Sequence, residues 1–304
     1  MEEFTLPEGF HCYVIRHISA KKVVFFAHAN GVSALTYKHF FECLSESLEA
    51  TVFSYDMRGM GKSQEVEKNL HEANPSWVWE LLAMDHIYIF HALQKQFPED
   101  FEKKQLLLMG HSLGAWLSLM TSHRLPHNLP ILLDPPVLHW KVSSIWSYAI
   151  LTGRRHLHLI GQKARKRRKV YDTEKQALDA FKRSTLMSGW DEQALKNYIE
   201  ATFEKHGEKF YLRHDPLWEA TIFESMPMTT LTGLLNIPFF ARRKIPYHFI
   251  VGEHSDACNA DAGWYIRTLL KSAHWFVKSN AKHMFPIEDP KGTVELLCKL
   301  KMIR

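Results

Sequence analysis

The sequence has little cysteine, and its cysteines form no recognisable framework. The chain of 304 residues contains four of them, Cys12, Cys43, Cys258 and Cys298. They are far apart and include no C-x-x-C pair, which excludes a disulfide scaffold or a zinc-ribbon site as the organising feature. We therefore expect small, reduced thiols in a reducing compartment.

The sequence also lacks a long hydrophobic run. The nearest candidate, residues 129–150, is interrupted by Asp134, Pro135, Pro136, His139 and Lys141, so it falls short of the roughly 18 apolar residues that span a membrane. The first residues are acidic and do not form a basic segment followed by an apolar one, so no signal peptide is expected. These absences predict a cytoplasmic protein without a transmembrane segment.

Two common signatures of cofactor binding are missing as well. Residues 56–63 end like a phosphate-binding loop, but Asp56 stands where G-x-x-x-x-G-K-[ST] requires glycine, and its charge would repel a phosphate. The pair His71-Glu72 does not continue as H-E-x-x-H, and His156 and His158 have no acidic residue nearby. The sequence therefore predicts no metal and no organic cofactor.

Positive charge is concentrated in one stretch. The net charge is +5, and much of the excess lies in residues 163–169. A local excess of this kind is not a nucleic-acid footprint, so we expect no nucleic-acid partner. We interpret the basic run Arg165–Lys169 as a solvated loop, with binding of acidic partners or phosphates as the alternative.

Strand-like and helix-like segments alternate from residue 22 onwards. Apolar runs typical of buried strands occur at residues 22–27, 51–55, 106–109, 129–133, 247–252 and 275–277. Helical spacing of apolar residues occurs at 37–48, 76–96 and 113–123. Alternation of this kind predicts an α/β fold with a mostly parallel sheet flanked by helices.

The pattern changes after Asp134-Pro135-Pro136. No convincing strand appears for about 100 residues, whereas helices are expected from Thr173 and from Asp191. We therefore predict a core made of residues 1–135 and 241–304, with a helical cap at 136–240 inserted after the sixth core strand. Its aromatic residues either line an apolar pocket against the core or pack the insertion itself; they are Trp140, Trp146, Tyr148, Phe181, Trp190, Phe203 and Trp218.

One segment organises the chemistry that we expect. The strand at 106–109 leads into Gly110-His111-Ser112-Leu113-Gly114, and a helix follows. A Gly-x-Ser-x-Gly pattern between a strand and a helix is typical of a nucleophile elbow, in which the serine lies at the tip of a sharp turn. Gly110 and Gly114 allow the two limbs of the turn to approach closely. The sequence therefore predicts Ser112 as a catalytic nucleophile.

A serine nucleophile needs a histidine base and a carboxylate that orients it, in the chain order serine, acid, histidine. His283 lies in a loop after the last predicted strand and is our candidate base. Asp256 follows the strand that ends at Gly252, and we predict it as the acid. Asp134, which also ends a core strand, could reach the same histidine and remains the alternative.

These segments together resemble the α/β-hydrolase superfamily. In chain order, His28–Gly31, Asp56–Ser63, Gly110–Gly114 and His283 are similar to its H-G loop, its D-x-R-G-x-G-x-S turn, its elbow and its C-terminal histidine. Residues 28–31, residues 132–136 and the inserted segment look like a branch of bacterial capped hydrolases described as esterase- or lipase-like. Ala29 departs from the usual glycine, and Arg58 takes a structural role in this pattern.

The resemblance implies an oxyanion hole formed by the backbone N–H groups of Asn30 and Leu113. It implies a serine hydrolase that cleaves a carboxylic ester, either a lipid-like ester or a lactone, in a small-molecule substrate. The same triad also serves C–C bond hydrolysis, thioester hydrolysis and acyl transfer, and a non-catalytic ligand-binding homologue is a further alternative.

Overall fold

The structure is a computed structural model of the chain. It describes residues 1–64, 66, 77–184, 186–187, 189–227, 238 and 244–300. The predicted start of the helix at residue 76 and the predicted end of the insertion at residue 240 lie outside these residues. Among the described helices, none is long and apolar enough to cross a membrane.

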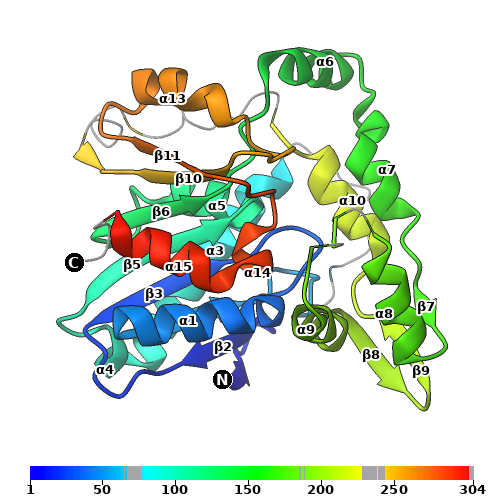
Figure 1. The fold of residues 1–304 in the computed structure, drawn as a ribbon, viewed down its shortest axis with the longest axis horizontal. Coiled ribbons are helices and arrows are strands. Elements are labelled where there is room, and N and C mark those ends of the chain that lie inside the picture. Colours follow the sequence, from blue (N-terminus) through cyan, green and yellow to red (C-terminus); the bar gives the residue numbers. More distant parts are fainter. Residues whose placement is uncertain are drawn as a thin grey trace.

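An eight-stranded sheet forms the centre of the molecule (Figure 1), with the strand order β1-β2-β4-β3-β5-β6-β10-β11. Its strands are Glu2–Thr5, His11–Ile15, Lys22–Ala27, Ala50–Tyr55, Gln105–His111, Leu129–Leu133, His248–Gly252 and His274–Lys278, labelled β1 to β6, β10 and β11. β2 pairs antiparallel with β1 and with β4, and the other neighbours are parallel. This is the fold that the alternating pattern predicted.

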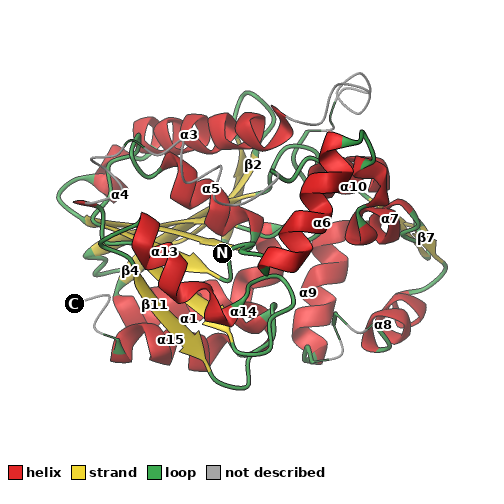
Figure 2. Cartoon of the chain, turned by 90° about the horizontal axis from the view of Figure 1, so that it is seen from above, coloured by secondary structure: helices red, strands yellow, loops and turns green. Residues whose placement is uncertain are grey.

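Helices cover both faces of the sheet (Figure 2). The main ones are α1 (Lys38–Leu48) and α15 (Pro290–Lys299) on one face, and α3 (Val78–Gln96), α5 (Leu113–Thr121) and α13 (Gly263–Leu269) on the other. Shorter helical segments are η1 (Ala34–Tyr37), α4 (Pro98–Phe101), η4 (Ala260–Ala262) and α14 (Phe285–Glu288). In β3, Val24 and Phe26 pack towards α1 whereas Phe25 packs towards α3. The strand is apolar on both faces because helices cover both.

The chain leaves this sheet after β6 and returns to it at β10. We call the residues between them, 134–247, the inserted segment. Its described helices are α6 (Trp140–Leu151), η3 (Arg155–Leu157), α7 (Leu159–Arg165), α8 (Glu174–Lys182), α9 (Glu192–Thr202) and α10 (Pro216–Glu224). The predicted N-caps of α8 and α9 are confirmed, because Thr173 accepts a hydrogen bond from the backbone of Gln176 and Asp191 accepts one from that of Ala194.

The prediction that this segment contains no strand was wrong. It carries a three-stranded antiparallel sheet formed by β7 (Val170–Tyr171), β8 (Phe203–His206) and β9 (Lys209–Leu212). Gly207, with φ +62°, makes the turn between β8 and β9. The strands are only two to four residues long, and β8 is polar after Phe203, so none of them forms an apolar run long enough to predict a strand.

The basic run is not a uniformly solvated loop. Arg165 makes two hydrogen bonds to the carboxylate of Glu224, at 2.9 and 2.6 Å, and Arg167 pairs with the buried Glu219 at 2.6 Å. Both carboxylates lie on α10, so these arginines join α7 and the residues after it to α10. Lys166, between the two, is exposed.

Of the two roles suggested for the aromatic residues of the insertion, packing describes most of them. Five of them are buried in hydrophobic clusters and pack the insertion against itself or the core: Trp146, Phe181, Trp190, Phe203 and Trp218. Trp140 and Tyr148 are 67% and 61% exposed, so they pack neither a core nor an enclosed pocket.

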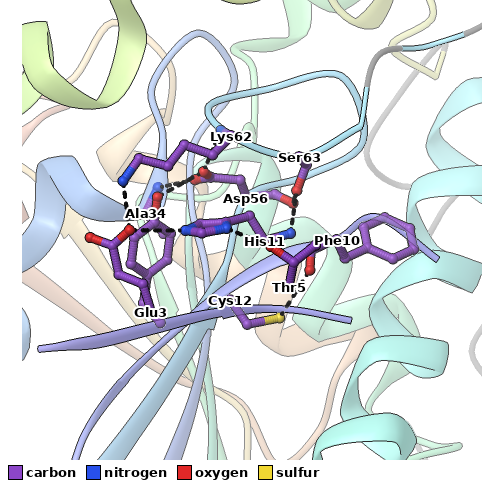
Figure 3. A network of polar contacts seen from close by, with 10 residues as sticks. Glu3, Thr5, Phe10, His11, Cys12, Ala34, Asp56, Lys62 and Ser63 are labelled. Atoms are coloured by element: carbon purple, nitrogen blue, oxygen red, sulfur yellow. Dashed lines mark hydrogen bonds and ion pairs between the residues drawn. The ribbon is translucent and has the colours of Figure 1, made fainter. Parts of the chain in front are cut away.

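Asp56, the residue that excludes a phosphate-binding loop, anchors several backbone segments (Figure 3). One carboxylate oxygen accepts from the Ala34 amide at 2.8 Å, and the other accepts from the Tyr13 hydroxyl and the Lys62 amide, each at 2.9 Å. Burial and the nearby Asp56 carboxylate raise the pKa of Tyr13. Gly61 has φ +55°, and a Cβ there would lie 2.1 Å from Asp56, so only glycine fits. This turn is structural and holds the loop that precedes α1.

Candidate active site

Ser112 lies between β5 and α5 with φ 55° and ψ −119°, a strained conformation for a residue with a side chain. The close approach expected of the two glycines is present. A Cβ on Gly110 would lie 2.2 Å from the carbonyl oxygen of Gly114, and a Cβ on Gly114 would lie 2.0 Å from that of Ala27. The Ser112 amide donates to the Leu133 carbonyl at 2.9 Å, which fixes the turn to the neighbouring strand β6.

Ser112, His283 and Asp134 form a continuous hydrogen-bonded chain. His283 Nε2 lies 3.1 Å from Ser112 Oγ, and His283 Nδ1 lies 2.6 Å from Asp134 Oδ2. Because a carboxylate only accepts, Nδ1 carries the ring proton and donates it to Asp134. Nε2 therefore presents its lone pair to the serine hydroxyl, which is the arrangement that a general base requires.

The structure does not bring Asp256 to this histidine. Asp256 is exposed, four residues beyond the last residue of β10, whereas Asp134 is fully buried and directly follows β6. β6 is the neighbour of β5, with Leu133 paired to His111, so Asp134 is next to the elbow. The structure therefore contradicts the prediction of Asp256 as the partner of His283. The carboxylate that is hydrogen-bonded to His283 is that of Asp134, the alternative that the sequence left open.

The loop that contains Asp256 contributes hydrogen-bond donors to Asp134 instead. The Gly252 amide donates to Asp134 Oδ1 at 2.7 Å, and the Ser255 hydroxyl donates a short hydrogen bond to Oδ2. Together with His283, three donors surround a carboxylate that has no exposed surface. The orientation of Asp134 is therefore fixed from both sides, which in turn fixes the ring of His283.

A second histidine, His111, links three loops of the site. Its Nε2–H donates to the His283 carbonyl at 2.9 Å, so Nδ1 accepts from the Tyr37 hydroxyl at 2.6 Å. The Tyr37 oxygen also accepts from the Ala29 amide at 3.3 Å. Burial and the neighbouring His283 lower the pKa of His111 well below its usual value, so the ring is neutral. Sequence reasoning did not single out Tyr37 or His111, because no local pattern indicates this contact.

Asn30 and Leu113, the predicted oxyanion donors, lie on the two loops beside Ser112. Within the described residues, neither backbone N–H has a hydrogen-bond acceptor. Leu113 is the first residue of α5, where N–H groups are unpaired and the helix dipole favours negative charge. Ala29, which replaces the usual glycine, does not have a positive φ and is accommodated.

His28 holds the loop that carries Asn30. The ring is fully buried, and its Nε2 accepts from the Met57 amide at 2.8 Å, so Nδ1–H donates to the Ala29 carbonyl at 2.7 Å. Burial lowers the pKa of His28, which keeps the ring neutral. The imidazole therefore joins the end of β3 to the turn after β4.

The inserted segment contacts the same loop from outside. The Asn30 side-chain amide donates to the Glu219 carbonyl at 3.1 Å, and a Cβ on Gly31 would lie 2.7 Å from Glu219 Oε1. Glu219 is itself paired with Arg167 and with His214, and these two partners lower its pKa to about 2 despite its burial. A buried ion-pair cluster thus packs against the residues next to the elbow. Among the described residues, no cluster of His, Cys, Asp or Glu could hold a metal ion.

Comparison with known proteins supports the fold described above. Residues 24–296 match the profile of the alpha/beta hydrolase family. A search of curated proteins found no match.

Many solved structures share the fold. One is a peroxisomal alpha-beta-hydrolase from Saccharomyces cerevisiae, with TM-score 0.70, 16% identity, and coverage of 96% of this chain and 80% of that one. Another is the thioesterase domain from the curacin biosynthetic pathway, with TM-score 0.70, 14% identity, and coverage of 98% and 99%. A thermophilic esterase from Thermogutta terrifontis has TM-score 0.59, 14% identity, and coverage of 97% and 95%. At these identities the likeness concerns the fold alone.

Proposed function

Because this chain belongs to the alpha/beta hydrolase family, we propose that it is a serine hydrolase that cleaves a carboxylic ester through an acyl-enzyme. One observation carries the proposal: Ser112 Oγ, His283 and the buried Asp134 lie in hydrogen-bonded sequence, at 3.1 and 2.6 Å. Nucleophile, base and orienting acid are the three groups that acyl transfer to serine requires.

In the first half-reaction, Ser112 Oγ attacks the ester carbonyl while His283 Nε2 takes the hydroxyl proton. Asp134 keeps the ring in the Nδ1–H tautomer and stabilises the imidazolium that forms. The carbonyl oxygen becomes an anion that accepts hydrogen bonds from the Asn30 and Leu113 amides, each worth on the order of 3 kcal/mol in comparable sites. The intermediate collapses, the C–O bond breaks, and the departing alkoxide takes the proton from His283.

In the second half-reaction, water replaces the alcohol. His283 Nε2 removes a proton from water as the oxygen attacks the acyl carbon of the serine ester. The second tetrahedral intermediate uses the same two amides. Its collapse returns the proton to Ser112 Oγ and releases the carboxylic acid, so the enzyme is regenerated without any external reagent.

The inserted segment takes the place of a cap in this proposal. Its contacts support that role, since Glu219 packs against Gly31 and the side chain of Asn30 hydrogen-bonds to α10. A cap in this position excludes water and shapes the substrate pocket, so its residues would select the acyl group. A lipid-like ester or a lactone is the substrate class that we propose.

A substrate series tests the function. Purified protein is assayed with p-nitrophenyl esters of increasing acyl length, with an aliphatic lactone and with an acyl thioester, each beside the Ser112→Ala variant. We expect ester turnover that Ser112→Ala reduces by more than about a thousandfold. Faster turnover of the thioester would move the assignment to a thioesterase that uses the same residues. Equal turnover by both proteins would refute Ser112 as the nucleophile.

A further inference from the structure

The helices α6 and α7 lie on the side of the inserted segment drawn in green in Figure 1, and with η3 between them they carry many exposed apolar side chains. Eight of the 17 exposed large hydrophobic side chains among the described residues lie between residues 140 and 160. The most exposed are Ile145 at 71%, Leu151 at 74% and Leu159 at 76%. Contiguous exposed apolar groups mark an interaction site, whereas scattered ones do not. We call this region, residues 140–166, the α6–α7 surface.

The inner side of the same helices is already occupied. The indole N–H of Trp146 donates to the Met226 carbonyl at 3.1 Å, and His158 stacks on Phe223. A Cβ on Gly161 would lie 3.1 Å from Glu224 Cγ, so glycine at this position allows α7 to approach α10 closely. The contacts on the buried side therefore fix the orientation of α6 and α7, so that their other side chains face solvent.

The positive charge of this region indicates the charge of the surface that it would bind. Residues 135–171 contain nine lysines and arginines and no aspartate or glutamate, whereas the whole chain has a net charge of only +5. Arg165 and Arg167 are used internally, as described above. Lys141, Arg154, Lys163 and Lys166 are exposed, and within the described part of the chain none of them has an ion-pair partner. An acidic surface is the complement of such a set.

We propose that the α6–α7 surface docks on the surface of an anionic lipid bilayer. Apolar side chains together with lysines and arginines are the two signals that peripheral membrane binding requires. Trp140 and Tyr148 are the aromatic types that prefer the headgroup layer, and Lys141 lies 5.6 Å from the ring centre of Trp140. The helices lie in the interface without crossing the bilayer.

Docking there places the active site near the lipid. α6 begins six residues after Asp134, so it follows closely on the carboxyl-terminal end of β6, where Asp134 contacts His283 and, through it, Ser112. Esters dissolved in the bilayer would then reach the site without crossing bulk water. The docking itself is independent of the proposed hydrolysis, and Ser112→Ala should bind lipid as the wild type does.

Co-sedimentation with vesicles tests the proposal on the full chain. Vesicles of phosphatidylcholine, with and without phosphatidylserine, are compared at low and high salt. We expect binding to the anionic vesicles that salt weakens. Ile145→Ser/Leu151→Ser should lower the partition coefficient at least about tenfold. Ile18→Ser, at a residue with 103% relative exposure outside the surface, is the matched control and should change nothing.

A charge series completes the test. The combined Lys141→Gln/Arg154→Gln/Lys163→Gln/Lys166→Gln variant should lose roughly fivefold in partition per charge, and with it the preference for phosphatidylserine. A control replaces four exposed lysines elsewhere with glutamine: Lys95, Lys175, Lys271 and Lys299. If both variants lost the same amount of vesicle binding, net charge alone would explain the loss, and the proposal would be overturned.

Two further outcomes overturn it. One is that the wild type fails to bind anionic vesicles at low salt. The other is that it self-associates in a way that Ile145→Ser/Leu151→Ser abolishes, because this face would then join two copies of the chain. Circular dichroism of each variant establishes that it is folded.

Discussion

Replacing Asp134 with asparagine should lower kcat/KM by about four orders of magnitude, or about 5.5 kcal/mol of transition-state stabilisation. This size is the one measured when the acid of a serine protease triad is made neutral. The carboxylate accepts from Gly252, Ser255 and His283. An asparagine has one acceptor oxygen, and the Gly252 amide donates its hydrogen bond to that oxygen. Its NH₂ group then faces His283 Nδ1 and stabilises the wrong tautomer, in which Nε2 carries the proton and cannot act as a base.

The assay is initial-rate hydrolysis of a p-nitrophenyl ester, with thermal unfolding of each variant measured in parallel. Asp256→Asn is the matched control; because this side chain is exposed and away from His283, we expect activity within about twofold of wild type. Ser255→Ala keeps the carboxylate but removes one of its donors, and we expect a loss of about tenfold. If Asp256→Asn is the crippling change while Asp134→Asn stays folded and active, the assignment of the acid is wrong.

Three other predictions concern stability. Tyr37→Phe leaves the buried Nδ1 of His111 without a donor and should cost about 1–3 kcal/mol in denaturant unfolding; an unchanged midpoint would contradict the network. Glu219→Gln leaves the partly buried Arg167 without its counter-ion and should cost about 3–5 kcal/mol, whereas Glu219→Gln/Arg167→Met should recover much of that loss. Burial lowers the pKa of His86 to about 3, so below about pH 6.5 the unfolded state binds a proton that the folded state excludes. The free energy of unfolding should therefore fall as pH decreases from about 6.5 towards 3, and His86→Phe should flatten that slope; parallel curves would contradict it.

The sequence predicted the parts of the site that rest on local pattern. Ser112 follows from a Gly-x-Ser-x-Gly motif between a strand and a helix, and His283 follows from its place after the last strand. The acid could not be settled in this way, since both Asp134 and Asp256 follow core strands. Strand order decides between them: β6 is next to β5, and Asp134 comes directly after it. That order arises from long-range pairing, which has no local signature.

The buried face of α3 could not be read from its apolar spacing for a related reason. Met84 and Tyr88 are exposed, whereas Leu82, Ile89 and Phe90 are buried. The helix carries apolar residues around most of its circumference, so periodicity does not select one side. Packing against β3 and β5 makes the selection.

Labelling with a fluorophosphonate probe, followed by peptide mass spectrometry, tests the central claim most directly. The probe reacts with a serine only where a base and an oxyanion hole activate it. We predict a single adduct, on Ser112, that is absent from Ser112→Ala and strongly reduced in His283→Ala. An adduct on another serine, or none in a folded protein, would contradict the account.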